Sequence, residues 1–153
     1  MKRAVARVVD AQNRLYERVR HRDAWTVTAA TSGFEHLRGH KYAVLVTFRR
    51  SGEPVPTAVW FGLDGDRLYV RTERRSGKVK RLRSDSRVLV APSDFRAKPL
   101  GPAAEGHARI LERADAEHGE RALATKYGLF RRVYEGVGEQ LNADMVYLEV
   151  TPA

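Results

Sequence analysis

The chain has 153 residues, no cysteine and a formal net charge of +9, from 28 Lys and Arg against 19 Asp and Glu. That length fits one domain, and a domain of about 150 residues buries roughly 68–70% of its unfolded surface. The absence of cysteine excludes disulfide scaffolds, zinc–thiolate sites and cysteine nucleophiles. No apolar run reaches the ~18 residues of a membrane span, and the first residues lack the apolar stretch of a secretory signal. We therefore expect a soluble, cytoplasmic protein.

The excess positive charge is concentrated in one central segment. Residues 67–98 hold eleven basic and three acidic residues, whereas residues 99–153 hold six and nine. A second, smaller excess lies in residues 1–23, with seven basic and three acidic residues. A local positive field of this kind attracts anions. Nucleic acid, an acidic membrane surface and a multiply charged small molecule are the candidate partners, beside a basic surface that only faces solvent.

The N-terminal part predicts a helical extension. Apolar residues recur at helical spacing over residues 3–22, with arginines between them. Residues 31–33 predict a loop, and residues 34–38 a short helix that ends at Gly39. We divide the chain into an N-terminal helical extension, residues 1–33, and a main domain, residues 34–153.

The next segment predicts an antiparallel meander. β-Branched and aromatic residues predict three strands, at residues 42–48, 55–61 and 67–72. They are joined by a turn after Ser51 and by the Asp64-Gly65 hairpin signal. Pro54 and Pro56 favour an edge or a bulge for the second strand, because proline has no N–H for a ladder hydrogen bond.

The second half of the chain adds three strands and the remaining helices. The strands are predicted at residues 87–91, 105–111 and 144–150. The helices are predicted at residues 77–85, with Ser76 as N-cap, at 115–127, and in a further stretch to about residue 140. Residues 92–104, rich in proline, predict a loop. The fold class is mainly β with short helices: a six-stranded antiparallel barrel with peripheral helices.

Familiar catalytic and metal motifs are absent from the sequence. Ser76-Gly77-Lys78 is no nucleotide phosphate loop, because Thr72 and Val79 stand where that motif needs Gly and Ser or Thr. The five histidines form no metal-binding pattern, and there is no GxSxG motif or obvious acid–base pair. We therefore predict no metal site, and the catalytic residues stay unassigned.

An anion site is predicted where the third strand meets the following helix. The first N–H groups of a helix have no partner within it and favour an anion, and Gly77 permits a close approach of the backbone. The side chains expected around this site are those of Arg71, Thr72, Ser76, Lys78 and Lys80. A basic helix start that binds nothing is an equally open alternative.

Several stretches of the chain resemble a known family. They read KYAVLVTFRRSGEPVPTAVWFG, DRLYVRTERRSGKVKRLRSDSRVLVAPSDFRAKPLGPAAEG and, more weakly, KYGLFRRVY and MVYLEVTP. Over about residues 37–153 the chain is similar to the split β-barrel flavin and deazaflavin enzymes of the pyridoxamine-phosphate-oxidase-like superfamily. The likeness is greatest to the actinobacterial branch that uses the deazaflavin coenzyme F-420. It implies a homodimer of two six-stranded split barrels, with the cofactor at their interface.

The same resemblance implies the cofactor contacts. The coenzyme phosphate would be held by Ser76, Lys78 and the N–H groups around Gly77. The ring would lie along the second strand, mostly on the backbone of Thr57, Ala58, Val59 and Trp60. The ring or ribityl chain would also be reached by Arg71 and Thr72. The phospholactyl or oligoglutamate tail would be contacted by Arg96 and Lys98.

One position departs from the family pattern. Relatives carry an arginine two residues before the phosphate-binding lysine, where this chain has Ser76. The cations expected to compensate are Arg74, Arg75 or Lys80. The identity of the cation that completes the phosphate site is therefore open.

The leading hypothesis is an oxidoreductase that transfers a hydride between F-420 and an organic acceptor. The basic segment carries more charge than the single phosphate of flavin mononucleotide needs, which favours F-420. Flavin mononucleotide is the alternative cofactor, and a non-catalytic cofactor or anion-binding module is the alternative class. Nucleic acid is disfavoured because no motif of basic and aromatic residues interleaved on a strand is present. Trp60, Phe61 and Tyr69 are candidate walls of the acceptor pocket or, alternatively, buried core residues.

Overall fold

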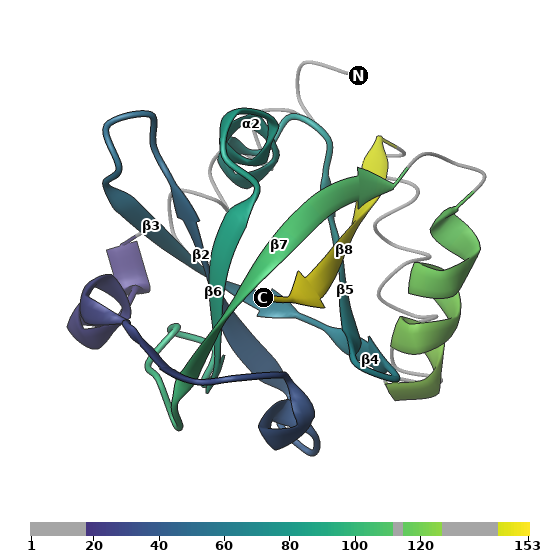
Figure 1. Ribbon diagram of the computed structural model, residues 1–153, viewed down its shortest axis with the longest axis horizontal. Helices are drawn as coiled ribbons and strands as arrows, with labels where there is room; N and C mark the ends of the chain where they lie inside the picture. The colour runs from purple at the N-terminus through teal and green to yellow at the C-terminus, as the bar shows by residue number, and fades with distance from the viewer. Residues whose placement is uncertain (1–17, 112–114, 127–143) are drawn as a thin grey trace.

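The computed structural model describes residues 18–111, 115–126 and 144–153 (Figure 1). All six predicted strands are present. They are β2 (Tyr42–Phe48), β3 (Pro54–Trp60), β5 (Arg67–Glu73), β6 (Arg87–Ser93), β7 (Ala103–Leu111) and β8 (Met145–Pro152). Two short strands were not predicted, β1 (Ala29–Thr31) and β4 (Gly62–Asp64).

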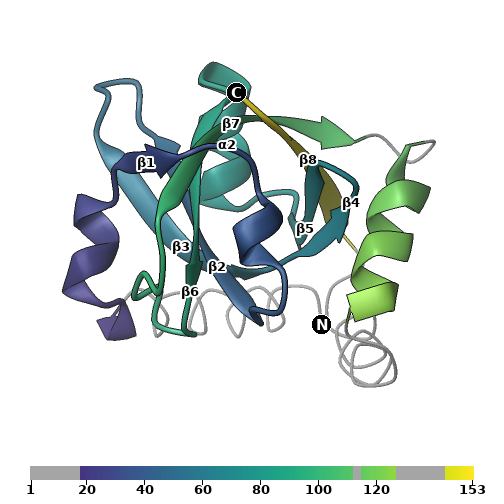
Figure 2. The same ribbon diagram turned by 60° about the horizontal axis from the view of Figure 1, so that its bottom comes forward.

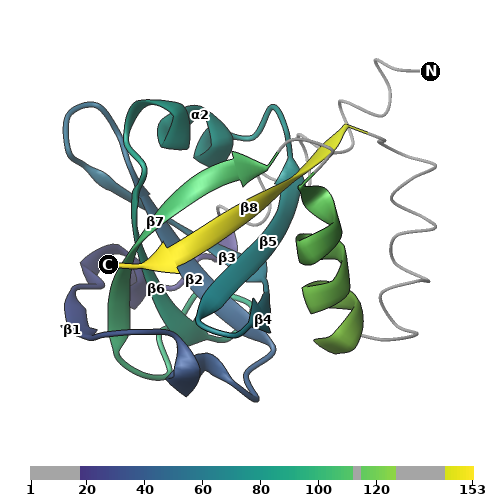
Figure 3. The same ribbon diagram turned by 45° about the vertical axis from the view of Figure 1, so that its right-hand side comes forward.

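The strands form one curled sheet. Its order is β3-β2-β6-β7-β8-β5-β4, each neighbouring pair is antiparallel, and β1 pairs with β7 in parallel. Figures 1 and 3 show the sheet wrapping round on itself, with helix α2 (Gly77–Ser84) at one end and β4 at the other. The predicted fold class, a mainly β antiparallel barrel with peripheral helices, is confirmed. The described sheet has eight strands rather than six.

The predicted strand at residues 55–61 is interrupted at its end. β3 pairs with β2, whereas Gly62 starts β4 and lies opposite Tyr69 of β5. The backbone of Gly62 packs directly on a helix at residues 116–126, since a Cβ on Gly62 would lie 2.5 Å from the carbonyl carbon of Ala122. The prolines of β3 lie in an edge strand of the described sheet, as predicted.

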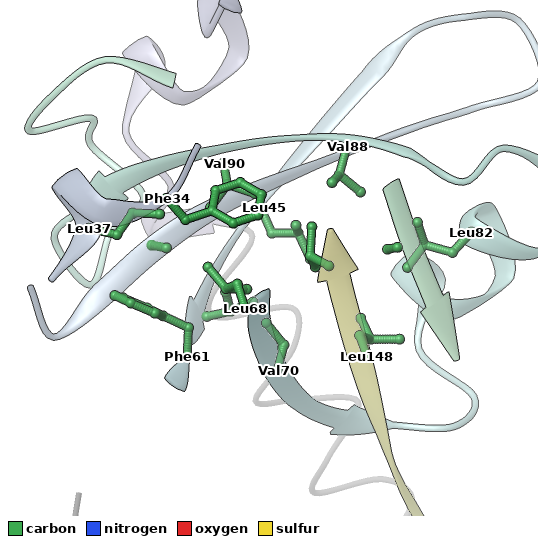
Figure 4. Packing of buried hydrophobic residues seen from close by; sticks show 14 of the residues in the cluster. Phe34, Leu37, Leu45, Phe61, Leu68, Val70, Leu82, Val88, Val90 and Leu148 are labelled. Carbon is green, nitrogen blue, oxygen red and sulfur yellow. The ribbon is translucent and has the colours of Figure 1, made fainter. Parts of the chain in front are cut away.

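The main core fills the inside of the barrel (Figure 4). Leu45, Phe61, Leu68 and Leu148 are all completely buried there. Val79 and Leu82 of α2 join the same cluster, as the helical spacing of these two residues predicts. One continuous apolar cluster therefore holds α2 on the end of the barrel.

The N-terminal segment packs on the outer face of β2 and β3, as Figure 2 shows in part. Ala24, in the 3-10 turn η1 (Arg22–Thr26), is 1% exposed and packs with Val44, Val46 and Ala97. Residues 18 and 19 are helical and residues 20 and 21 are not, so the predicted helix end at residue 22 is wrong. The helix stops because His21 caps η1 instead, its ring nitrogen accepting from the Asp23 N–H. The remainder of that helix lies outside the described residues, and the boundary at residue 33 stays a prediction.

The bounds of the other predicted elements differ less from those in the structure. The short helix predicted at residues 34–38 is a 3-10 turn, η2 (Glu35–Leu37). The predicted loop at 92–104 is shorter, because β6 continues to Ser93, opposite Tyr42, and β7 already begins at Ala103, opposite Ala29. The predicted helix at 115–127 is seen at residues 116–126, and the stretch that follows it lies outside the described residues. No helix in the described ranges is long and apolar enough to cross a bilayer.

Candidate functional site

The start of α2 is built as the sequence predicts, with one difference. Ser76 is the N-cap residue and has an extended backbone, but its side chain makes no capping hydrogen bond within the described structure. Its Oγ lies 3.4 Å from Oγ1 of Thr72, the last inward-facing residue of β5. The first-turn N–H groups of α2 are therefore not satisfied by the serine side chain, and this helix end can accept an anion.

Lys78 turns back onto this cluster rather than into solvent. Its Nζ donates to Thr72 Oγ1 over 3.0 Å, and the residue is half-buried. Burial, and to a smaller degree the nearby charge of Arg81, together lower the pKa of Lys78 to about 8. A bound anion favours the charged form of an amine, so it would offset both effects. Lys78 thus lies against the protein, because Thr72 supplies an acceptor beneath the first turn of α2.

Arg81 is the cation that the sequence analysis missed. Its Nε donates to Oγ1 of Thr47 over 2.6 Å, across from α2 to β2. Its guanidinium also packs on Gly77, where a Cβ would lie 2.7 Å from Arg81 Nη1. The absence of a side chain at Gly77 thus lets the guanidinium lie directly against the backbone of the first turn. Residues three and four apart share a helix face, so the spacing of Arg81 from Lys78 and Gly77 was the available signal.

A polar patch lies just inside this end of the barrel. Thr47 is completely buried, and its partner across the ladder is Val55. Thr57, two residues further along β3, lies opposite Leu45, and its buried Oγ1 has no hydrogen-bond partner among the described residues. Buried hydroxyls in native proteins almost always have a partner, which can be a ligand or an ordered water. The hydroxyl of Thr57 is therefore a group that a polar ligand could satisfy.

The predicted ring-binding residues divide between two faces. Thr57 and Val59 lie on the inner face of β3 with the main core, whereas Ala58 and Trp60 lie on the outer face. β3 has only one strand neighbour in the described sheet, β2, so its other backbone edge has no ladder partner there. That edge is what a ring held mostly by backbone contacts would need.

The residues of β5 also divide. Thr72 faces inward, along with the core residues Leu68 and Val70. Arg71 points to the opposite face, the side on which Tyr69 is buried. The structure therefore brings Thr72, but not Arg71, to the cluster at the start of α2.

Other predicted cations lie elsewhere. Lys80 and Arg75 are exposed, and Arg74 pairs with Asp144 at 2.9 Å. Arg96 is exposed and ties down the N-terminal segment: its Nε donates to the Val19 carbonyl over 2.9 Å, and its own carbonyl accepts from the N–H of His21. Arg81 is a cation that lies against Gly77 and lowers the pKa of Lys78, while the role of the three predicted substitutes for the missing arginine stays a prediction.

The three candidate pocket aromatics have different surroundings. Tyr69 is a buried core residue whose hydroxyl donates to Oε2 of Glu149 over 2.9 Å. Trp60 is half-buried and lies near Tyr42, with 6.4 Å between the ring centroids. Phe61 is completely buried in the core and is also one of the residues that line a cavity of about 560 Å³. No group of three or more metal-binding side chains occurs among the described residues.

Solved structures with this fold come from several bacteria. The haem storage protein HutZ of Vibrio cholerae is 16% identical, with a TM-score of 0.59 over 78% of this chain and 86% of that one. A conserved hypothetical protein of Mycobacterium tuberculosis is 21% identical, with a TM-score of 0.57 over 81% and 85%. An F-420 reductase is 20% identical, with a TM-score of 0.51 over 81% and 96%. At these identities the likeness shows the fold alone.

Sequence comparison identifies the family directly. No curated protein matches the chain. The family described as pyridoxamine 5'-phosphate oxidase, however, matches residues 33–153, which include the whole barrel from β2 to β8 and the cluster at α2. The chain therefore belongs to the pyridoxamine 5'-phosphate oxidase family.

Proposed function

We propose that the protein is an oxidoreductase that binds the deazaflavin coenzyme F-420 and transfers a hydride between it and an organic acceptor. The observation that carries the proposal is the cluster of Thr72, Ser76, Lys78 and Arg81 around Gly77 at the start of α2. Two cations and the helix N-terminus meet there, and this combination suits a phosphate group.

The choice of F-420 over flavin mononucleotide rests on charge. Residues 67–98 carry eight more basic than acidic residues, an excess larger than one phosphate needs. The F-420 coenzyme has a phosphodiester and a γ-glutamyl tail, so a wide basic surface suits it. The similarity of fold to an F-420 reductase supports the same choice, while flavin mononucleotide remains the alternative cofactor.

The residues at the site fit such a coenzyme. Lys78, Arg81 and the first N–H groups of α2 would hold the phosphate, and the open edge of β3 around Thr57 would lie along the ring. The bound coenzyme supplies the hydride chemistry, while the protein binds and orients it and keeps water away. The hydroxyl of Thr57 is buried beside this edge and can donate one hydrogen bond to a polar group.

The proposed protein is a cytoplasmic homodimer with a small-molecule acceptor and no nucleic-acid or membrane partner. The second backbone edge of β3 pairs with no other strand of the described sheet, which supports a second copy nearby. Light scattering should give the mass of a dimer at micromolar concentration. A stable monomer would contradict this part of the proposal.

Calorimetric titration tests the choice of cofactor. The full chain should bind F-420 more tightly than flavin mononucleotide, and reduced F-420 should be reoxidised when a suitable acceptor is added. If flavin mononucleotide bound equally or more tightly, the choice of F-420 as the cofactor would be wrong. Tight F-420 binding without turnover across a broad acceptor screen would instead favour a non-catalytic binding module.

A further inference from the structure

A second candidate binding site lies away from α2. The 560 Å³ cavity is formed where the turn at residues 38–41, the segment of Phe61 and β4, and the helix at 116–126 meet. Figures 1 and 3 show β4 and this helix toward the end of the barrel that α2 does not cover. Its volume is that of a site for a small organic molecule, since such pockets measure about 300–1,000 Å³.

The floor of the cavity is apolar and rigid. Phe61 belongs to the main core and Leu63 packs against it, while Ala122 is buried in the helix above. That helix has a fixed position, because Gly62 contacts the backbone of Ala122 and Gly119 packs on the ring of Tyr147. The cavity is therefore held open by packed elements on these sides.

The remaining lining is cationic. Arg38, Lys41 and Lys126 line the cavity together with His40, and no carboxylate is among the described residues that line it. Arg38 is bound to Glu35 through two hydrogen bonds of 2.7 and 3.1 Å, and this pairing holds the turn in place. The balance of charge at the lining is thus positive, which favours an anion.

Lys126 places a positive charge directly against the apolar part of the cavity lining. Its Nζ lies 3.0 Å from the centroid of the Phe61 ring, so the ammonium sits over the apolar floor. Burial lowers the pKa of Lys126 to about 7, which shows that its charged form is poorly solvated there. A carboxylate would stabilise that charged form, while an apolar group beside it would lie against Leu63 and Ala122.

We propose that this cavity binds a small monocarboxylate with an apolar body, its carboxylate beside Lys126 and its apolar part against Leu63 and Ala122. This site is separate from the cluster at α2, and the proposal does not depend on F-420 binding. It assigns to the chain a second ligand site, for an aliphatic or aromatic acid.

Octanoate and 1-octanol are suitable probes because they share an alkyl chain and differ in charge. In calorimetric titration of the full chain, octanoate should bind at one site at least about tenfold more tightly than octanol. A charge-assisted hydrogen bond contributes roughly 1.5–3 kcal/mol, and about 1.4 kcal/mol corresponds to a tenfold change in affinity. Lys126→Met should remove this preference and leave octanol binding unchanged. Lys80→Met is the matched control, an exposed lysine on α2, and should bind both probes as the parent does.

The amide NMR spectrum of the unmodified chain locates the ligand even where a variant fails to fold. Octanoate should shift the amides of residues 38–41, 61–63 and 122–126. Octanol binding as tightly as octanoate, or octanoate binding unchanged in Lys126→Met, would overturn the proposal. Shifts confined to the start of α2, or no binding at millimolar octanoate, would overturn it equally.

Discussion

The two ends of the barrel present cations in different ways. At α2, Lys78 and Arg81 surround a helix N-terminus and bond to the threonine hydroxyls of Thr72 and Thr47. At the other end, Lys126 lies over the ring of Phe61, beside an apolar floor. The first end offers many hydrogen-bond donors and suits a phosphate, whereas the second offers charge above a hydrophobic surface and suits an amphipathic acid. Similar residue types thus favour different ligands because of what lies beneath them.

The two ends share one core, and damage to it should affect both. Leu148 is completely buried and contributes to the cluster that includes Phe61 at one end and Leu82 of α2 at the other. Leu148→Ala should lower the free energy of unfolding by about 2–5 kcal/mol, from lost burial and the cavity left behind. Urea denaturation measures this, and a loss below about 1 kcal/mol would show that Leu148 is not part of a shared core.

Removing the lysine at α2 should affect only that end. Lys78→Ala should weaken F-420 binding about ten- to a hundredfold, since a charge-assisted hydrogen bond contributes roughly 1.5–3 kcal/mol. Octanoate affinity should not change, and Lys80→Ala should bind F-420 as the parent does, because Lys80 is exposed. Calorimetry compares the three proteins. If Lys80→Ala or Arg96→Ala abolished binding while Lys78→Ala did not, the phosphate site would lie elsewhere in the basic segment.

A change at Gly62 should affect the cavity at Lys126 and leave the start of α2 unchanged. Gly62→Ala places a Cβ within 2.5 Å of the Ala122 backbone, so the helix at 116–126 must shift. Overpacking of this kind costs about 1–3 kcal/mol of folding stability. Octanoate binding should weaken while F-420 binding is kept. Weakening of both ligands to the same degree would contradict the separation of the two ends.

Coenzyme affinity should depend on pH in a way that reflects Lys78. Burial, the charge of Arg81 and, to a smaller degree, that of Arg20 lower its pKa to about 8, while Glu73 raises it. Above that pH the free protein loses the ammonium that an anion needs, so affinity should fall by up to about tenfold between pH 7 and 9. Titrations at several pH values measure this. The pH dependence should disappear in Lys78→Met, and its persistence there would assign it to another group.

Local patterns predicted most of the barrel. Alternation of apolar residues placed β2 and β5, and the helical spacing of Val79 and Leu82 placed α2. The short strand β4 was not predicted; its first residue, Gly62, packs on Ala122, sixty positions further along the chain, and no local pattern marks that contact.

The candidate site was less predictable because it depends on contacts between residues that are far apart in the sequence. Ser76 and Lys78 follow from the strand–turn–helix order, but the role of Arg81 depends on Thr47 in a different strand. Arg71 and Thr72 are neighbours in sequence, yet a strand turns them to opposite faces. The cavity at Lys126 joins three segments that are far apart in the chain, and no local motif marks it.

The amide NMR spectrum on addition of F-420 tests most directly the central claim, that the α2 end is the coenzyme site. The largest shifts should fall on residues 72–81 and along β3, with residues 61–63 and 122–126 little changed. The largest shifts at the Lys126 cavity, or no saturable shift at all, would contradict the assignment of the coenzyme phosphate to the start of α2.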